Sequence, residues 1–138
     1  MEEPPPSDGR VQVLVGDDPP PVRAAARAVV ARVDGFDLVG ESASGEEAVT
    51  LSEQLRPDLV LMDINMGAMD GLEATRRITA ARPETLVILV STYAVEDLPP
   101  GARSSGAAAY VNKDELSPKL VRRLWDDGGD PDWRTALT

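Results

Sequence analysis

The sequence predicts an α/β protein built on a doubly wound, five-stranded parallel sheet with helices on both faces. Short apolar runs alternate with segments of helical periodicity through most of the 138 residues, which is typical of strand–helix–strand units. The runs at 59–62 (LVLM) and 86–90 (LVILV) contain no polar residue. Such runs fit strands that are buried on both faces, as in a parallel sheet covered by helices.

Five segments fit the strands of this sheet in length and composition. We expect them at residues 11–15, 36–40, 58–62, 86–90 and 107–111. Hydrophobic residues make up 42% of the chain and aromatic residues only 4%, so the core should consist mainly of Val, Leu, Ile and Ala. Strand–helix alternation with short connections favours the flavodoxin-like strand order 2-1-3-4-5.

Four helices are expected where apolar residues recur at helical spacing. The first begins in the proline run 19–21, because proline is tolerated in a first helical turn. The second begins at the capping-box pair Ser44 and Glu47 and runs through residue 55. The third spans 70–82, with Asp70 as its cap and Glu73 as the reciprocal partner. The last begins at Ser117, directly before a proline, and ends before two glycines.

The connection between the fourth and fifth strands departs from this regular pattern. A helix should lie around residues 95–105, but this segment contains Leu98, Pro99, Pro100 and Gly101 in a row. An interior proline costs about 3 kcal/mol and removes a helix hydrogen bond, and glycine adds about 1 kcal/mol. We therefore predict a broken or shortened helix, with a short turn before Pro99, a break, and at most a brief second segment.

The chain is expected to form one domain over residues 10–127, between a flexible N-terminal tail at 1–9 and a C-terminal tail at 128–138. Trp133 is able to dock the C-terminal tail, and no second hydrophobic pattern indicates an output domain. The N-terminal segment is acidic and proline-rich, unlike a signal or transit peptide. No apolar run approaches the roughly 20 residues that span a membrane. A cytoplasmic location is therefore expected.

The composition argues against several classes of function. A formal net charge of −10 argues against a nucleic-acid surface, which needs clustered Lys and Arg. The chain has neither Cys nor His. Disulfides, thiolate metal sites, cysteine nucleophiles and catalytic schemes with a histidine base are thereby excluded.

Five polar residues lie just beyond the predicted strands, at the edge where open α/β sheets bind ligands. Asp17 and Asp18 follow the first strand, Asp63 the third, Ser91 the fourth, and Lys113 the fifth. Taken singly, each is also explained as a helix cap or a surface charge. Together, three carboxylates at close range repel one another, and Mg²⁺, which prefers oxygen ligands, relieves that repulsion. A carboxylate nucleophile beside a metal, a lysine and a hydroxyl suits phosphoryl transfer.

Four segments resemble the motifs of receiver domains in two-component response regulators, the CheY-like family. They are LVLMDINMGAMDG at 59–71, VQVLVGDD at 11–18, VILVSTY at 87–93 and AAAYVNKDE at 107–115. The segment LEATRRI at 72–78 is similar to the LuxR/NarL-type subgroup, which often carries a helix-turn-helix output domain. The resemblance covers roughly residues 11–125.

The resemblance implies a role for each residue of the site. Asp63 accepts a phosphoryl group from the phosphohistidine of a sensor histidine kinase and forms an acyl phosphate. Asp18, Asp63 and the backbone carbonyl of Asn65 bind Mg²⁺ directly, and Asp17 acts through water. Lys113 pairs with Asp63 beforehand and then holds the phosphoryl group. The chain is thus a phosphoacceptor that catalyses only its own phosphorylation and dephosphorylation.

Ser91 and Tyr110 are implied to form the switch. Ser91 moves toward the new phosphate and Tyr110 turns inward behind it, which changes a surface around the fourth helix, fifth strand and fifth helix. For Tyr110 the alternative is a half-buried packing aromatic. The implied partners are the kinase, an unidentified downstream protein and, on phosphorylation, a second copy of the chain. Neither a membrane nor direct nucleic-acid contact is expected.

Two further residues depart from the receiver pattern. Gly67 stands where proline is usual, which widens the backbone states open to the acceptor loop. Thr92 stands where a small residue is usual, and its branched side chain is expected to narrow access to Asp63 and slow phosphate entry and hydrolysis. Together with the broken helix, these departures leave a second interpretation open, in which the chain is a receiver that signals without being phosphorylated.

The leading interpretation is a stand-alone receiver, whose output is a protein contact altered by phosphorylation. Three other interpretations compete with it. The nearest is a receiver excised from a longer DNA-binding transcription regulator. A Mg²⁺-dependent phosphatase of the haloacid dehalogenase type needs a second Asp where Asn65 stands, and a nucleophile on the first strand. A flavin or nucleotide binder needs a glycine-rich loop after the first strand, where Asp17, Asp18 and Pro19 stand instead.

Overall fold

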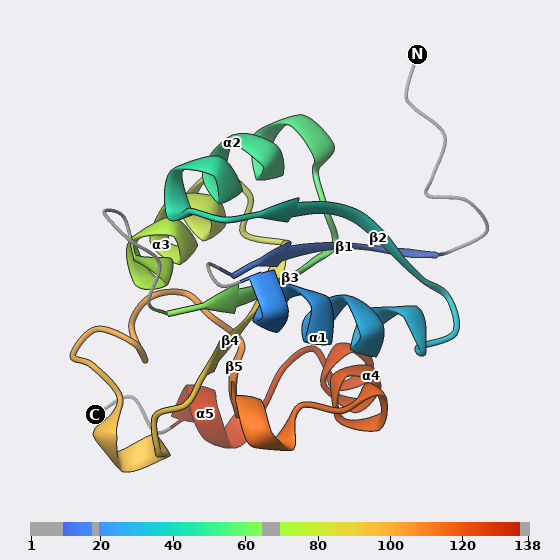
Figure 1. Cartoon of the computed structure of the whole chain (residues 1–138). Coiled ribbons are helices and arrows are strands. Elements are labelled where there is room, and N and C mark those ends of the chain that lie inside the picture. The colour runs from blue at the N-terminus through green and yellow to red at the C-terminus, as the bar shows by residue number, and fades with distance from the viewer. Residues whose placement is uncertain (1–9, 18–19, 65–69, 136–138) are drawn as a thin grey trace.

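The computed structural model describes residues 10–17, 20–64 and 70–135, and their strands form one parallel sheet. The strands are β1 (Val11–Gly16), β2 (Phe36–Ser42), β3 (Leu59–Asp63), β4 (Leu86–Ser91) and β5 (Ala109–Asn112). They lie in the order β2-β1-β3-β4-β5 (Figure 1). The predicted fold class and strand order are confirmed, and the strand boundaries differ from the expected ones by one or two residues.

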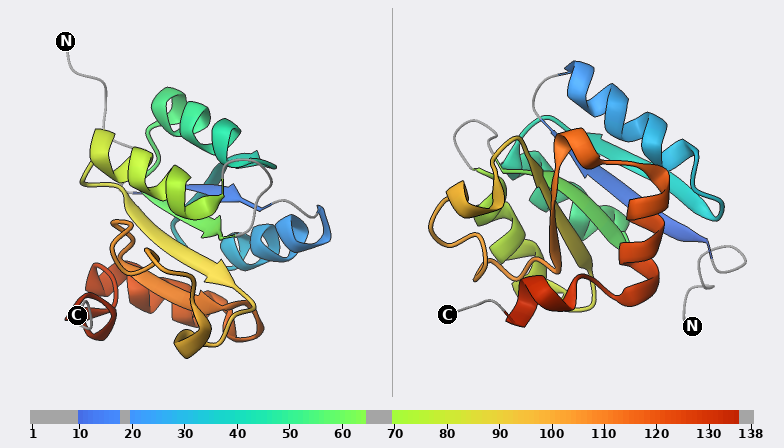
Figure 2. Two further views of the ribbon diagram at one scale, coloured as in Figure 1. Left: turned by 90° about the vertical axis from the view of Figure 1, so that its left-hand side faces the viewer. Right: turned by 90° about the horizontal axis from the view of Figure 1, so that it is seen from below.

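Helices cover both faces of the sheet (Figure 2). The α-helices are α1 (Pro20–Ala31), α2 (Gly45–Leu55), α3 (Gly71–Ala81), α4 (Pro118–Asp127) and α5 (Pro131–Thr135), and two 3-10 turns are η2 (Val95–Asp97) and η3 (Lys113–Glu115). α1 and α4 pack on one face, and α2 and α3 pack on the other. The four helices predicted from the sequence are therefore α1 to α4.

Side-chain caps begin α2 and α4 as predicted. The Ser44 hydroxyl accepts a hydrogen bond from the N–H of Glu47 at 3.1 Å, and the Glu47 carboxylate accepts one from the N–H of Ala43 at 2.9 Å. The capping box is thus present, with its return bond one residue before the cap. At α4, the Ser117 hydroxyl accepts from the N–H of Leu120 at 3.1 Å. These bonds satisfy N–H groups that have no partner inside the helix.

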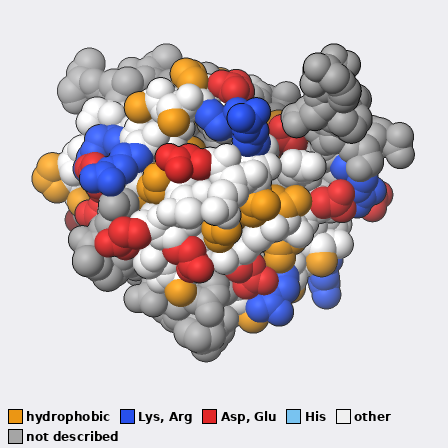
Figure 3. Space-filling model, turned by 90° about the horizontal axis from the view of Figure 1, so that it is seen from above, with side chains coloured by type: hydrophobic (Ala, Val, Ile, Leu, Met, Phe, Trp, Pro, Cys, Tyr) orange, Lys and Arg blue, Asp and Glu red, His pale blue; other side chains and the backbone are white. Residues whose placement is uncertain are grey.

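The start of α3 differs from the expected capping box. Asp70 accepts from the N–H of Glu73 at 2.9 Å, as predicted. The Glu73 side chain does not return to the cap but pairs with Arg76 at 3.1 Å and Arg77 at 2.9 Å. Arginines three and four positions further along the helix compete for the carboxylate. These pairs place acidic and basic side chains beside each other on the outer surface of α3, and both kinds of charge are seen on the face of the molecule viewed from above in Figure 3.

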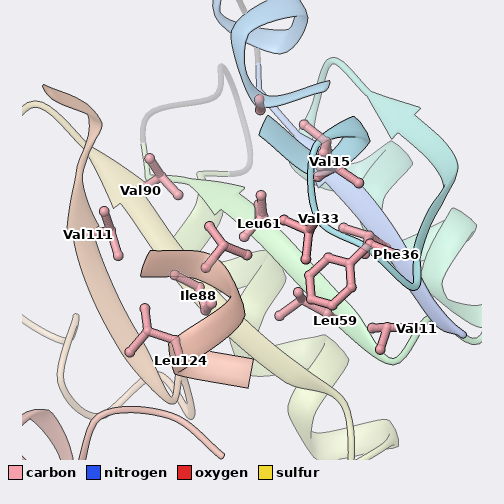
Figure 4. Packing of buried hydrophobic residues seen from close by; sticks show 14 of the residues in the cluster. Val11, Val15, Val33, Phe36, Leu59, Leu61, Ile88, Val90, Val111 and Leu124 are labelled. Carbon is pink, nitrogen blue, oxygen red and sulfur yellow. The ribbon is translucent and has the colours of Figure 1, made fainter. Parts of the chain in front are cut away.

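Alternate residues of the strands point into two separate hydrophobic cores. The α1/α4 core contains, among others, Val13, Val15, Leu59, Leu61, Ile88, Val90, Ala109, Val111, Val121 and Leu124 (Figure 4). The α2/α3 core contains, among others, Leu14, Val60, Met62, Leu72, Ile78, Val87, Leu89, Ala102, Ala107 and Trp133. Every strand next to the site therefore has one row of side chains on each side of the sheet.

The crossover from β4 to β5, residues 92–108, contains no α-helix, and all of its residues are described. It makes the short turn η2 and then continues as turns and bends through the Pro99–Pro100 pair. Gly101 has a φ of +90°, a backbone region that favours glycine. The segment lines an open groove of about 660 Å³. The predicted break is confirmed, and the helix that follows β5 is consequently α4 here.

The chain after α4 packs against the sheet. Gly128 adopts a φ of +72° and ends α4, and the N–H of Asp130 donates to the carbonyl of Ala108 at 2.9 Å. Trp133 of α5 is 5% exposed, and its indole N–H donates to the carbonyl of Ala107 at 3.1 Å. The domain boundary predicted at residue 127 stays a prediction. Trp133, which the sequence indicated as able to dock the C-terminal tail, is buried in the α2/α3 core.

Candidate functional site

Three charged residues predicted for the site lie on one side of the sheet at its carboxyl edge. Asp17, Asp63 and Lys113 lie two positions beyond residues of the α1/α4 core in β1, β3 and β5. Strand alternation therefore turns all three toward the same side. They line one small cavity, of about 50 Å³, whose walls include residues of β1, β3, β4 and α1. The parallel sheet thus brings together side chains from distant parts of the sequence.

One lysine bridges the two carboxylates. Lys113 Nζ lies 3.4 Å from Asp63 Oδ1 and 3.6 Å from Asp17 Oδ2. Asp17 is 4% exposed and Asp63 is 3% exposed. Two buried carboxylates and one ammonium leave an excess negative charge where water screens it poorly.

The excess negative charge and the burial of the cluster affect the pKa of Asp17. The pKa of Asp17 is raised from its ordinary 3.8 to about 6, first by burial and then by the neighbouring Asp63 carboxylate, while Lys113 acts in the opposite direction. Desolvation and a neighbouring like charge both disfavour the ionised form. A cation placed between the two carboxylates would relieve both effects.

Gly71 fixes how α3 meets the end of β3. Its N–H donates to the carbonyl of Ile64 at 2.7 Å, and a Cβ at this position would stand 1.8 Å from the backbone oxygen of Asp63. Only glycine permits this approach. Gly71 ends the motif at 59–71, but the sequence alone indicated no role for it. The available signal was a glycine at the first position of a helix, where propensity favours almost any other residue.

Ser91 and Tyr110 lie on the opposite side of the sheet from the charged cluster. Ser91 is 1% exposed and directly follows Val90, which pairs in register with Asp63. Tyr110 is half-buried beside the α2/α3 core, and its hydroxyl donates to the backbone carbonyls of Ser91, at 3.1 Å, and Tyr93. Burial raises the pKa of the Tyr110 phenol, so it remains a hydrogen-bond donor. Tyr110 therefore packs against the core and is also tied to the end of β4.

Asn112 supports the site and was missed by the sequence reasoning. Its side-chain oxygen accepts from the N–H of Asp114 at 2.9 Å and caps η3, which begins at Lys113. Its side-chain amide donates to the carbonyl of Tyr93 at 3.1 Å. These two bonds hold the backbone on which the lysine stands. An Asn just before a short turn was the available signal.

The described ranges do not cover every residue that was predicted for the site. Asp18, Asn65 and Gly67 lie outside the described residues, and the Thr92 side chain is exposed. Within the described ranges, no group of three or more acidic, His or Cys side chains is placed to hold a metal ion. Asp17 and Asp63 supply hard oxygen donors and a net negative charge, which fit Mg²⁺. A complete ligand set would need residues outside the described ranges, such as Asp18.

The fold and site define a class of α/β proteins with a buried acidic pair, bridged by lysine, at the carboxyl edge of a parallel sheet. In the part of the chain that the structure describes, none of the helices has the length and apolar character needed to cross a membrane. Residues 13–124 match the family described as the response regulator receiver domain. The chain belongs to this family, as the resemblance implied.

Individual relatives agree with this assignment. The chain is 35% identical over 127 residues to the transcriptional regulatory protein YhcZ of Bacillus subtilis (strain 168), covering 92% of this chain and 59% of YhcZ. It is 38% identical over 114 residues to the response regulator GacA of Pseudomonas viridiflava, covering 83% of this chain and 53% of GacA. The chain thus spans somewhat more than half the length of these relatives.

A solved structure gives the same assignment. It is a two-component response regulator of the LuxR family from Aurantimonas sp. SI85-9A1, with a TM-score of 0.78 and 26% identity, covering 93% of this chain and 95% of that one. Receivers of this family are signalling domains that interact with histidine kinases and downstream effectors. Phosphorylation by the kinase is their general function, and they generally bind Mg²⁺ for it.

Proposed function

We propose that this receiver accepts a phosphoryl group on Asp63 from the phosphohistidine of a partner histidine kinase and thereby switches a protein-interaction surface. The observation that carries the proposal is the buried pair Asp17 and Asp63 bridged by Lys113, at 3.6 Å and 3.4 Å. Asp63 is the acceptor in this scheme because β3 lies at the centre of the sheet. Groups that follow the strands on either side can reach it there.

The proposed transfer is a single displacement at phosphorus. A carboxylate oxygen of Asp63 attacks the phosphorus, an O–P bond forms, and the N–P bond of the phosphohistidine breaks. The bonding electron pair returns to the imidazole of the kinase, and Asp63 becomes an acyl phosphate. Because the chain itself has no His, the donor must come from another protein or from a small phosphodonor.

Mg²⁺ fits the acidic residues proposed to hold it. When bound, it would neutralise negative charge on the transferring group. The ligands in this proposal are Asp18, Asp63 and the backbone carbonyl of Asn65, with Asp17 acting through water. The raised pKa of Asp17 supports this assignment, because it comes from burial and from the neighbouring Asp63 carboxylate, which Lys113 does not fully offset.

The remaining residues act on the phosphoryl group or respond to it. In this proposal the Lys113 ammonium moves from the carboxylate to a phosphoryl oxygen, and the Ser91 hydroxyl donates to another. Tyr110 follows, because its hydroxyl is held by the carbonyl of Ser91 at 3.1 Å. The interaction surface around β5 and α4 changes as a result.

A small phosphodonor provides the direct test. The chain is incubated with acetyl phosphate and Mg²⁺, and the intact mass is followed over time. We expect the mass of one phosphoryl group to be added to the wild-type protein, and we expect excess EDTA to prevent it. Asp63→Asn should remain unmodified. Light scattering on the same samples tests the proposed phosphorylation-dependent homodimer.

Asp37→Asn is the matched control. Asp37 is an exposed strand carboxylate paired with Arg10 at 2.7 Å, so its loss should leave phosphorylation unchanged. Modification of Asp63→Asn at the wild-type rate would refute Asp63 as the acceptor. Absence of modification in the wild type, with both the small donor and a phosphorylated kinase, would refute the proposal as a whole.

A second proposal is that this receiver is the regulatory part of a longer transcription regulator. It is favoured because the chain covers only 59% of YhcZ, whose name describes a transcriptional regulatory protein. The reading frame of the gene tests it. A frame that continues past Thr138 into a helix-turn-helix segment supports the longer protein, and a stop codon directly after Thr138 contradicts it.

A further inference from the structure

The C-terminal segment covers the part of the α2/α3 face that lacks a crossover helix. α4 packs against the α1/α4 core, whereas Trp133, which follows it, is buried in the α2/α3 core. The chain therefore passes around β5, which is the edge strand of the sheet. Figure 1 shows α5 beside β5. Asp130 begins this path by donating its N–H to the carbonyl of Ala108 at 2.9 Å.

Three neighbours hold Trp133 in place. Its indole N–H donates to the carbonyl of Ala107 at 3.1 Å. The guanidinium carbon of Arg103 lies 4.4 Å from the centroid of its ring, and Arg103 Nη1 donates to its carbonyl at 3.4 Å. The ring of Tyr110 lies 6.3 Å away, tilted by 33°. Arg103 belongs to the irregular crossover and Tyr110 to β5, so Trp133 packs against both the segment that replaces the crossover helix and the strand that follows it.

We propose that residues 130–135 form an intramolecular latch, in which Trp133 takes the place of the missing crossover helix and stays docked only while Tyr110 keeps its present position. The trigger of the latch rests on the function proposed above, but its docking contacts do not. A switch of this kind requires two states with different contacts. In one state the ring of Trp133 packs beside the ring of Tyr110. In the other state Tyr110 has moved away, and Trp133 has lost that contact.

The path from the acidic site to the latch runs through the backbone of β4. The Tyr110 hydroxyl donates to the carbonyls of Ser91 and Tyr93. If the end of β4 shifts when Ser91 contacts a phosphoryl group on Asp63, these two acceptors shift with it, and the ring of Tyr110 moves away from Trp133. The indole then becomes accessible to solvent, and α5 is released from the edge of the sheet. The position of the C-terminal segment would thereby report the state of Asp63.

Fluorescence quenching measures the docking directly. The chain has two Trp residues, so Trp125→Phe leaves only Trp133, and Trp133→Phe leaves only Trp125 as the matched control. Trp125 packs edge-on against Phe36 on the other side of the sheet, at 6.4 Å. On addition of Mg²⁺ and beryllofluoride, which mimics a phosphoryl group on a carboxylate, we expect acrylamide quenching of Trp133 to rise severalfold. Quenching of Trp125 should not change.

A second variant tests the latch without any phosphoryl analogue. In the Trp125→Phe background, Tyr110→Leu removes both the ring beside Trp133 and the hydroxyl, and should by itself raise the quenching of Trp133. Tyr93→Leu changes the other tyrosine of the chain, keeps the backbone carbonyl that Tyr110 uses, and should leave quenching near the wild-type value. Unchanged quenching in Tyr110→Leu would overturn the latch.

The two proposals fail in different ways. Fluorine NMR detects bound beryllofluoride independently of the tryptophans, with Asp63→Asn as the blank. Binding without a change at Trp133 would overturn the latch and leave the proposed phosphorylation intact. If beryllofluoride does not bind the wild type, the proposed phosphorylation loses its support, and the Tyr110→Leu result alone decides whether Trp133 docking depends on Tyr110.

Discussion

The two faces of the sheet use the same strands but are covered in different ways. On the α1/α4 face, helices of 12 and 10 residues pack over a continuous hydrophobic core. The α2/α3 face has two helices of 11 residues each, an irregular crossover and one tryptophan from beyond α4. The charged cluster continues the first face, and Tyr110 lies on the second. The fold therefore places the charged residues of the proposed transfer on one side of the sheet, and Ser91 and Tyr110, which are proposed to respond to it, on the other.

The difference arises in a few residues of the β4–β5 crossover. Pro99, Pro100 and Gly101 prevent a regular helix, which leaves apolar strand residues without their usual cover. Trp133 supplies part of that cover from a segment distant in sequence. A face completed in this way depends on a few long-range contacts. We therefore expect it to unfold locally at a lower free-energy cost than a face covered by two complete helices.

The largest effect on stability is expected at the start of α3. Gly71→Ala places a Cβ 1.8 Å from the backbone oxygen of Asp63, so α3 or the end of β3 must move. We expect a loss of about 3 kcal/mol or more, which exceeds the gain of about 1 kcal/mol from alanine's helix propensity. Urea unfolding measures the loss.

Gly128→Ala is the same change at the end of α4, with no atom within 4 Å of the new Cβ. Only its φ of +72° is unfavourable, so a loss of about 1 kcal/mol is expected. Equal losses in the two variants would show that contact with Asp63 does not control the start of α3.

The next largest effect compares a helix with the irregular crossover. Leu124 of α4 is 5% exposed in the α1/α4 core, whereas Leu98 of the crossover is only partly buried. Leu124→Ala should cost about 2–4 kcal/mol, and Leu98→Ala less than about 1 kcal/mol. The free energies of unfolding of both variants test this. Similar costs would mean that the crossover is packed as firmly as α4, which contradicts the contrast drawn between the faces.

A smaller, pH-dependent effect is expected at the charged cluster. The folded-state pKa of Asp17, about 6, lies above its ordinary 3.8, so the folded protein binds this proton more tightly than the unfolded chain. The resulting stabilisation is complete below about pH 4 and is lost as the pH rises through about 6. Asp17→Asn should therefore resemble the wild type near pH 4 and exceed it by about 1–2 kcal/mol near pH 7.5 without Mg²⁺.

Thermal or urea unfolding in EDTA at several pH values measures this difference. Asp37→Asn is the opposite control, because a hydrogen bond from Arg10 lowers the pKa of Asp37, so its removal should not stabilise the protein at neutral pH. If Asp17→Asn were less stable than the wild type at pH 7.5, the stabilisation from the ion pair with Lys113 would exceed the destabilisation from burying the Asp17 carboxylate beside Asp63.

The smallest effect on stability is expected in the crossover itself. Replacing Pro99, Pro100 and Gly101 together by Ala removes the helix breakers, so the far-UV circular dichroism should gain helical signal while stability changes by less than about 1 kcal/mol. Gly101→Ala alone keeps both prolines and should gain none. An unchanged spectrum in the triple variant would show that contacts such as those of Arg103, rather than the prolines, determine the irregular path.

The fold and the charged cluster were predictable because each depends on local signals. Apolar runs without polar residues identified the buried strands, and the residues that follow them identified Asp17, Asp63 and Lys113 as neighbours. The break at Pro99 followed from backbone chemistry alone. In each case a residue's type and its position along the chain were sufficient.

The features that were missed depend on contacts between distant segments or on competition between nearby ones. The sequence singled out Trp133 but does not say which face it enters. The role of Gly71 depends on how closely α3 approaches β3. Glu73 was expected at the cap, but Arg76 and Arg77 are better partners for its carboxylate. The raised pKa of Asp17 depends on burial, which only the assembled sheet determines.

The acceptor that restrains Tyr110 at the end of β4 is a main-chain oxygen. Substitution at position 91 can delete or replace the hydroxyl, but it leaves the carbonyl where the strand places it. In related sequences, the ability to contact a phosphate and the ability to anchor the aromatic ring can therefore be lost or retained separately. A variant such as Ser91→Ala would keep the hydrogen bond from Tyr110 to the carbonyl at position 91. It would lose the hydroxyl that is proposed to contact the phosphoryl group.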